Sequence, residues 1–345
     1  MQYCEPILKP KNLISEKGGV NMKKMINTVA ATLVISASLT SMVSAEENNE
    51  NPELTDDVIT YGDNLNSQQK DDVRKKLGAK ESYKSYDVSV DDVEKYTGVT
   101  YDHIYSSSVI EPKSFRKGVE TEIVTPDNIT KVTEEQYTNA AISAGIQNAK
   151  IRVASTIEPT TGDGALTGIV KAYAEAGNDL NAEDVRNANQ EMSELANINE
   201  ENKDDDGYSD AAMNNAIAEM KEKVVEEKQE NDNVSEDKVR NIVNDELKAK
   251  GLDNKLNENQ KEKVYNMIFN VANSNVLNND PKGFKKQIGD YKKNLEKNHG
   301  DLIDKAKDKA KDLNTEENRN FLQKIWDAIV NFVHWLWNLI SSFFK

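Results

Sequence analysis

An acidic loop between two expected helices contains the residues that come closest to a metal-binding pattern. Positions 1, 3, 5 and 9 of a calcium-binding loop would be Asn202, Asp204, Asp206 and Asp210. Position 12, where such loops supply a bidentate glutamate, is Met213, so the strongest ligand is missing. We therefore expect an acidic connection between helices, with these four residues as a weak calcium candidate and no other cofactor.

A glycine-rich turn, Thr161 to Gly168, precedes an expected helix and could hold an anion on its free backbone N–H groups. It lacks the Lys-Ser/Thr pair of a nucleotide-binding loop, and the Asp163 carboxylate at its mouth would repel phosphate. We expect the turn to begin the helix instead, with Gly168 allowing the helix to approach a sheet.

Residue types that carry catalysis do not form a recognisable set. His103, His299 and His334 lack the spacing of metal ligands. His103 and one of the serines at 106–108 could be drawn as a dyad, but proximity along the chain does not establish geometry. Paired acids are too common in this chain to single out a glycosidase pair. The sequence therefore assigns no catalytic residue and favours a non-enzymatic protein.

The overall charge is strongly negative. The chain has 345 residues, a formal net charge of −16, 30 % charged residues and a mean hydropathy of −0.75. This length suffices for one or two domains with hydrophobic cores. The negative charge would repel phosphates, so we expect no nucleic acid partner. The single cysteine, Cys4, excludes an intrachain disulfide framework.

Residues 22–45 have the pattern of a secretory signal peptide. Lys23 and Lys24 precede an apolar run, and Val43-Ser44-Ala45 offers small residues for signal peptidase. The pattern predicts export.

The position of this signal bears on where the mature protein begins. Signals start at the initiator methionine, so we interpret residues 1–21 as an extension upstream of Met22, with a genuine longer leader as the alternative. The mature chain would then start at Glu46 without any cysteine, which fits export from a Gram-positive cell. Residues 46–55 are acidic and asparagine-rich, and we expect a flexible leader there.

Residues 56–178 mix the periodicities of strands and helices, which predicts an α+β head. The expected strands are 57–61, 104–110, 119–124 and 149–157, and the expected helices are 66–77, 133–144 and 164–176. Asn66 with Gln69, and Thr133 with Gln136, have the spacing of capping boxes at two of these helix starts.

Four stretches of the chain form a recognisable series: SSSVIEP (106–112), NITKVT (128–133), YTNAAISAGI (137–146) and GALTGIVKA (164–172). Together they resemble the YpuA-like family of secreted Gram-positive proteins, a domain of unknown function. The likeness covers residues 56–230 with order and spacing kept. It implies export and association with the cell envelope, and it transfers no catalytic residues.

Residues 181–313 form a charged helical region with few aromatic side chains. The expected helices are 181–199, 208–230, 235–250, 257–277, 282–298 and 300–313. Several have thin apolar stripes, which favours an extended bundle, coiled coil or stalk. Residues 281–311, the basic neck, contain ten lysines against five acids. The lysines expected to face an anionic surface are Lys285, Lys286, Lys292, Lys293, Lys305 and Lys309.

Residues 321–345 predict an amphipathic helix, because their polar side chains fall in one narrow arc. The side chains expected to contact a membrane are Phe321, Leu322, Ile325, Trp326, Ile329, Phe332, Val333, Trp335, Leu336, Trp337, Leu339, Ile340, Phe343 and Phe344. A helix lying in the interface keeps the polar arc in water, whereas a single span would put Asp327 against lipid. A span, a pore, and packing as a core helix or oligomer interface remain alternatives.

Together these patterns favour an exported protein of the Gram-positive envelope. We expect the head to bind an unknown envelope partner and the C-terminal helix to hold the protein at an anionic membrane surface. A membrane-active or pore-forming protein and a cell-wall-acting enzyme are the alternatives, and self-association into a homo-oligomer stays open.

Overall fold

The computed structural model describes residues 54–114, 118–157, 159–177, 180–231 and 233–313. The expected signal peptide, most of the flexible leader and the amphipathic helix at 321–345 lie outside these residues. Within the described ranges, no helix combines the length and the apolar character needed to cross a bilayer.

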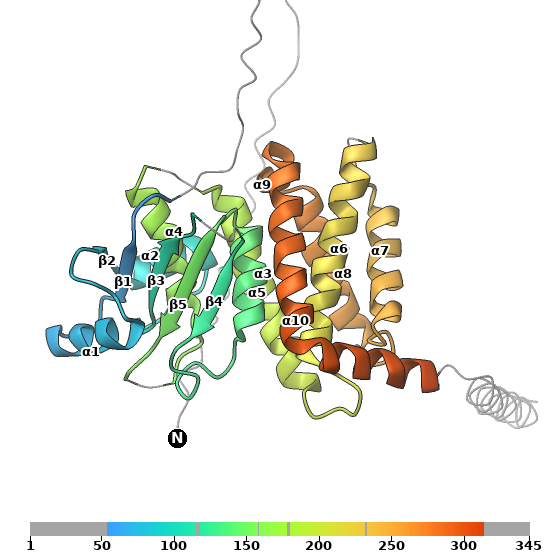
Figure 1. Ribbon diagram of the computed structural model, residues 1–345, viewed down its shortest axis with the longest axis horizontal. Helices are drawn as coiled ribbons and strands as arrows, with labels where there is room; N and C mark the ends of the chain where they lie inside the picture. The colour runs from blue at the N-terminus through green and yellow to red at the C-terminus, as the bar shows by residue number, and fades with distance from the viewer. Residues whose placement is uncertain (1–53, 115–117, 158, 178–179, 232, 314–345) are drawn as a thin grey trace, which may run out of the picture.

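The N-terminal part of the described chain forms one five-stranded mixed sheet (Figure 1). Its strands are β1 (Val58–Gly62), β2 (Lys84–Val88), β3 (Ser107–Pro112), β4 (Glu120–Ile123) and β5 (Ala149–Ala154). The order is β2-β1-β3-β5-β4, in which β1 and β2 are parallel, β4 and β5 are parallel, and the other pairs are antiparallel. With the helices that follow, this confirms the predicted α+β class.

Helices cover both faces of the sheet. They are α1 (Ser67–Leu77), α2 (Val90–Thr97), α3 (Glu134–Ser143) and α4 (Asp163–Glu175). Val73 and Leu77 of α1 pack with Ile59 on one face, while Val58 shares a core with α3 and α4 on the other. This split follows from the strand period, because neighbouring residues point to opposite faces.

The capping boxes predicted for α1 and α3 are both formed. Asn66 accepts from the backbone N–H of Gln69 at 3.0 Å, and the Gln69 side chain accepts from the Asn66 N–H at 2.8 Å. Thr133 and Gln136 make the same reciprocal pair. These bonds satisfy N–H groups that a helix start leaves without intrahelical partners.

The glycine-rich turn begins α4 and brings that helix close to the sheet. Gly162 stands at the N-cap with φ 90°, and no side chain caps the helix. A Cβ on Gly168 would lie 2.2 Å from the Thr60 hydroxyl of β1, so the predicted close approach is confirmed. The side chain of Asp163 lies outside the described atoms.

The C-terminal part is helical. Its helices are α5 (Ala182–Asn202), α6 (Asp210–Asn231), α7 (Glu236–Ala249), α8 (Glu258–Ala272), α9 (Asn275–Asn279) and α10 (Pro281–Leu313). The single helix expected at 257–277 is divided, because Ser274 caps a new helix. The two helices expected at 282–298 and 300–313 correspond to the two arms of α10, which meet at a kink where the backbone of His299 is not helical.

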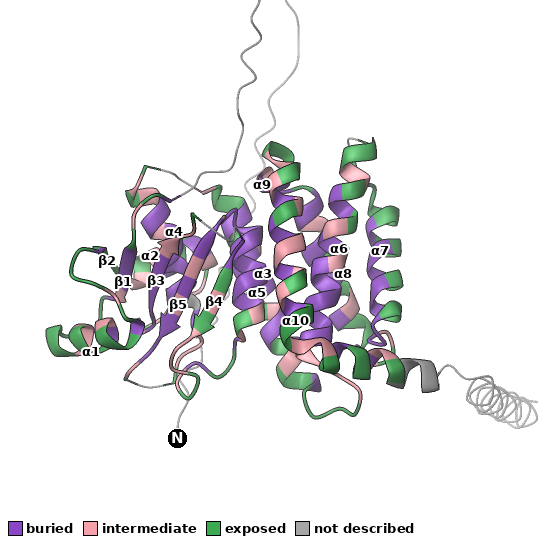
Figure 2. Ribbon diagram, in the orientation of Figure 1, coloured by how far each residue is buried: buried purple, intermediate pink, exposed green. Residues whose placement is uncertain are grey.

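These helices pack around α6 as a bundle, so the bundle alternative is confirmed and the extended stalk is not formed. Figure 2 shows buried positions along most of α6, whereas α1 is largely exposed. Helix α10 packs along α6, and α3 of the head packs against α5 (Figure 1). Small side chains let several helices approach α6 closely, and they leave no broad stripe in the sequence. The buried alanines of α6 are Ala211, Ala212, Ala216 and Ala218.

Candidate functional site

The structure does not bring the four calcium candidates together. Asn202 is buried at the end of α5, where its amide donates to the Ile198 carbonyl at 2.6 Å. Asp204 and Asp206 are exposed. Asp210 begins α6 and directs its carboxylate to the start of α3 instead. In the part of the chain that is described, no group of three or more His, Cys, Asp or Glu side chains could hold a metal.

The lysines of the basic neck divide into two groups. Lys285 pairs with Glu226 at 2.9 Å, and Lys292 pairs with both Glu219 and Glu222, so these two fasten α10 to α6. Three others, Lys286, Lys293 and Lys305, are exposed. The side chain of Lys309 and the residues of the amphipathic helix lie outside the described atoms.

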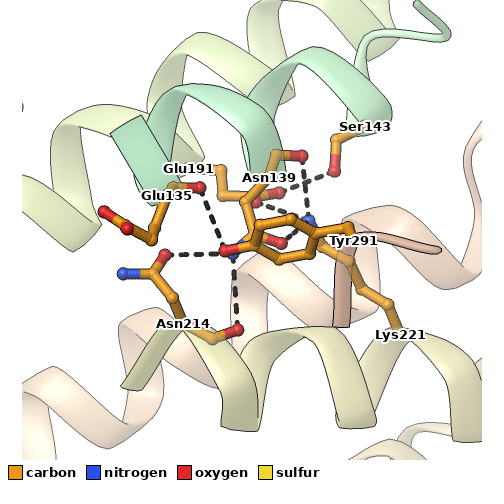
Figure 3. A network of polar contacts seen from close by, with 7 residues as sticks. All are labelled: Glu135, Asn139, Ser143, Glu191, Asn214, Lys221 and Tyr291. Carbon is orange, nitrogen blue, oxygen red and sulfur yellow. Dashed lines mark hydrogen bonds and ion pairs between the residues drawn. The ribbon is translucent and has the colours of Figure 1, made fainter. Parts of the chain in front are cut away.

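Helix α6 carries a lysine that is fully buried between helices (Figure 3). Lys221 is 0 % exposed, and its Nζ lies 2.6 Å from Oε1 of Glu191, which is 2 % exposed. Nζ also donates to Oδ1 of Asn139 at 3.3 Å, and Ser143 Oγ donates to the other Glu191 oxygen at 2.8 Å. Burial lowers the pKa of Lys221, and the neighbouring Glu191 carboxylate opposes this change.

The same network continues toward α10. Asn139 Nδ2 donates to Asn214 Oδ1 at 3.0 Å and to Tyr291 Oη at 3.4 Å. The Tyr291 hydroxyl donates to the Glu135 carbonyl at 3.2 Å. Burial raises the pKa of Tyr291 well above its usual value. The network therefore joins α3 of the head to α5, α6 and α10, and its enclosed position suits fastening rather than contact with a substrate.

Asp210 adds a second polar link between the head and α6. Thr133 Oγ1 and Gln136 Nε2 each donate to its carboxylate at 2.9 Å, so the capping box of α3 is tied to the first residue of α6. Burial raises the pKa of Asp210 to about 6, with the nearby Glu135 carboxylate adding to the rise and the two hydrogen bonds opposing it.

An accessible groove lies where the head meets α5, and it has two adjoining compartments. The wider one has a volume of about 570 Å³ and runs along α5. The narrower one, about 60 Å³, lies at the start of α4. Tyr101, Lys131 and Thr161 line both compartments, so we treat them as one groove. This groove is the candidate functional site, and a concave surface with a few converging polar groups is typical of ligand sites.

One wall of the groove is a stripe of polar side chains on α5. Asn187, Gln190, Glu194 and Asn197 follow one another at spacings of three, four and three residues. Such spacing places them on one side of a helix, over a length of about 15 Å. Amide side chains present both donors and acceptors along this length.

Two buried oxygens of the groove wall lack a protein partner. Asn189, which is 5 % exposed, donates from Nδ2 to the Val185 carbonyl at 2.9 Å, but its Oδ1 is unpaired. Thr160 Oγ1 is the corresponding oxygen in the narrower compartment. A buried polar atom without a hydrogen bond costs about 1–3 kcal/mol, so both oxygens favour a bound polar group.

The charges of the groove differ from those of the whole chain. Lys131 and Arg186 line it, and neither forms an ion pair with any residue that the structure describes. Glu194 is the only acid among the described lining residues, and it lies 2.6 Å from Lys263 Nζ. The described part of the groove is therefore locally cationic.

Aromatic rings line the narrower compartment. Tyr101, His103 and Tyr105 come from one loop before β3, and the rings of His103 and Tyr105 lie 4.7 Å apart. His103 thus belongs to the groove. His299 lies elsewhere, 2.9 Å from the Glu135 carboxylate, and His334 is outside the described residues.

The sequence contained a partial signal for the groove. The turn at 161–168 lines the narrower compartment, although its sequence favours a helix start over an anion site, and the regular spacing of Asn187, Gln190 and Asn197 is a further local signal. The loop that carries Tyr101 gave no sign of meeting α5, because their proximity depends on the tertiary fold.

The structure defines an α+β protein in which a mixed-sheet head and a helical bundle share a core beside a polar groove. The chain belongs to the family described as "Protein of unknown function (DUF1002)", whose model matches residues 61–291. It is similar to the "Uncharacterized protein YpuA" of Bacillus subtilis (strain 168), with 28 % identity over 302 residues, 84 % of this chain and 90 % of the relative. These matches confirm the YpuA-like resemblance and extend beyond residue 230. No solved structure matches the chain.

Proposed function

We propose that this chain is an exported, envelope-associated binding protein whose groove holds a polar ligand. The observation that carries the proposal is the unpaired Asn189 oxygen in a wall of amide side chains beside a volume of about 570 Å³. A groove that leaves such atoms unpaired loses stability that a ligand can restore. The signal-peptide pattern at residues 22–45 supports export.

The proposal includes attachment to a membrane through residues 321–345. The amphipathic pattern of these residues supports it, and so do Lys286, Lys293 and Lys305, which are exposed on the helix that leads toward them. Near an anionic leaflet each such lysine contributes about 1 kcal/mol. Flotation with vesicles containing anionic lipid tests this part, and binding that survives removal of residues 321–345 would contradict it.

Co-sedimentation with purified cell-envelope material tests the groove. Tyr101→Ala and Gln190→Ala each remove one contact, and we expect each to weaken retention about tenfold, the equivalent of about 1.4 kcal/mol. The control is Gln68→Ala, because Gln68 is exposed on α1 at the opposite face of the sheet. Retention that is the same for all four proteins would contradict a binding role for the groove.

A further inference from the structure

We infer that the ligand of the groove is an anionic glycan, a sugar chain that carries carboxylate or phosphate groups. This inference rests on the proposed function, because it names the chemical class bound by the same site. Three properties of the groove lead to it: the amide stripe of α5, the aromatic rings beside α4, and the two cationic side chains.

The unpaired oxygens call for a ligand that donates hydrogen bonds. Asn189 Oδ1 accepts only, so a purely anionic ligand such as inorganic phosphate would leave it unsatisfied. A sugar hydroxyl both donates and accepts, so it has the chemistry to pair with either oxygen, each of which is itself buried and would have to turn toward the groove. Successive sugars of one chain would meet successive members of the stripe Asn187, Gln190 and Asn197, which extends for about 15 Å.

The aromatic side chains suit the faces of sugar rings. A sugar ring presents C–H groups on its faces and hydroxyls around its rim. Tyr101 and Tyr105 offer an apolar ring that ends in a polar hydroxyl, so each can cover a C–H face and still meet the rim. Phosphate alone or a simple divalent cation would gain nothing from these rings.

The cationic side chains favour a glycan that carries negative charge. Lys131 and Arg186 line the wider compartment without a described carboxylate partner, and Glu194 is engaged by Lys263. Two such cations inside a chain of net charge −16 create a local field that differs from that of the surface around it.

Isothermal titration of the full chain with two tetrasaccharides tests the inference. One is a hyaluronan tetrasaccharide, in which alternate sugars carry a carboxylate, and the other is the neutral tetramer of N-acetylglucosamine. We expect the anionic tetramer to bind about tenfold more tightly at low salt, because each of two exposed charge pairs contributes up to about 1 kcal/mol. The difference should shrink in 1 M salt, where the screening length falls to about 3 Å.

Matched variants separate the contributions. The double substitution Lys131→Gln with Arg186→Gln should abolish the preference for the anionic tetramer and leave the neutral one unchanged. Tyr101→Ala should weaken both. The control is Lys75→Gln with Lys76→Gln, which removes the same charge from exposed positions on α1 and should change neither affinity.

The outcomes distinguish this inference from the proposed function. Equal binding of the two tetrasaccharides would overturn the anionic preference and leave a glycan-binding groove. Tyr101-dependent binding of tetraglutamate, with no response to either sugar, would identify a peptide ligand and overturn the glycan. If none of the probes binds, the inference of a glycan ligand is overturned as well. The proposed binding function is contradicted as well only if Tyr101→Ala leaves co-sedimentation with envelope material unchanged.

Discussion

Helix α5 carries polar side chains on two sides that have opposite surroundings. Glu191 points into the helical core, where Lys221 and Ser143 satisfy both of its oxygens. Gln190, the preceding residue, lines the groove, and beside it the oxygen of Asn189 has no protein partner. Buried polar groups that are fully paired hold helices together, whereas unpaired ones beside a cavity point to a ligand.

The comparison gives each cluster a different expected response to substitution. Changes in the paired network should alter the free energy of unfolding, because they leave buried partners without hydrogen bonds. Changes in the groove should alter ligand binding and leave unfolding nearly unchanged. The tests below run from the largest expected effect on stability to the smallest.

Replacing Lys221 by methionine should have the largest effect. Glu191 would remain as a buried charge without its cationic partner, with only the Ser143 hydroxyl still donating to it, and breaking such a pair costs about 3–5 kcal/mol. Urea unfolding followed by circular dichroism measures the loss. The double variant Lys221→Met with Glu191→Leu should recover most of it, since neither charge remains. A loss below about 1 kcal/mol in the single variant would show that the ion pair does not fasten the helices.

Asp210 should make stability depend on pH. Its pKa rises from 3.8 to about 6 on folding, so the folded state binds its proton more tightly. The resulting stability is fully present below pH 3.8 and is lost as pH rises through 6, at most about 3 kcal/mol. The free energy of unfolding, measured between pH 4 and pH 7, should decline more in the wild type than in Asp210→Asn. Parallel profiles would contradict the raised pKa.

The same substitution at two asparagines separates the two clusters directly. Asn139→Leu removes an acceptor from Lys221 and a donor from Asn214, and we expect it to cost about 2 kcal/mol. Asn189→Leu removes an oxygen that has no protein partner and also the hydrogen bond from Nδ2 to the Val185 carbonyl. These two effects have opposite signs, so we expect a net change within about 0.5 kcal/mol. Urea unfolding of both variants gives the comparison, and equal losses would remove the distinction between the network and the groove.

Local signals in the sequence were sufficient for much of the head. The capping residues Asn66 and Thr133 predicted two helix starts, because such caps act between residues three apart. Strand β2 and helix α2 were missed, even though Ser89 and Asp92 form a capping box of the same kind. Strand β2 is an edge strand of only five residues, in which Tyr86 and Val88 alternate with Ser85 and Asp87, so the alternation is too short to stand out from the exposed residues around it.

The network and the groove were beyond local signals for a physical reason. Lys221 lies in the middle of a charged helix, where a lysine normally faces solvent, and its partners Asn139 and Glu191 are 82 and 30 residues away. The groove likewise joins the loop of Tyr101 to α5 across the tertiary fold. A sequence shows which side chains can form hydrogen bonds, but the partners of each one depend on how the helices pack.

The smallest expected effect on stability is at Lys131 and Arg186, and for that reason it is the sharpest test of the groove. Both side chains are exposed and have no described ion-pair partner, so Lys131→Gln and Arg186→Gln should each change the free energy of unfolding by less than about 0.5 kcal/mol. Co-sedimentation with envelope material should nevertheless fall, because both cations line the groove. Since the stability is unchanged, such a loss of binding cannot come from unfolding. Unchanged stability together with unchanged binding would leave the two cations as ordinary solvated charges, and the groove would have to bind through its amides and rings alone.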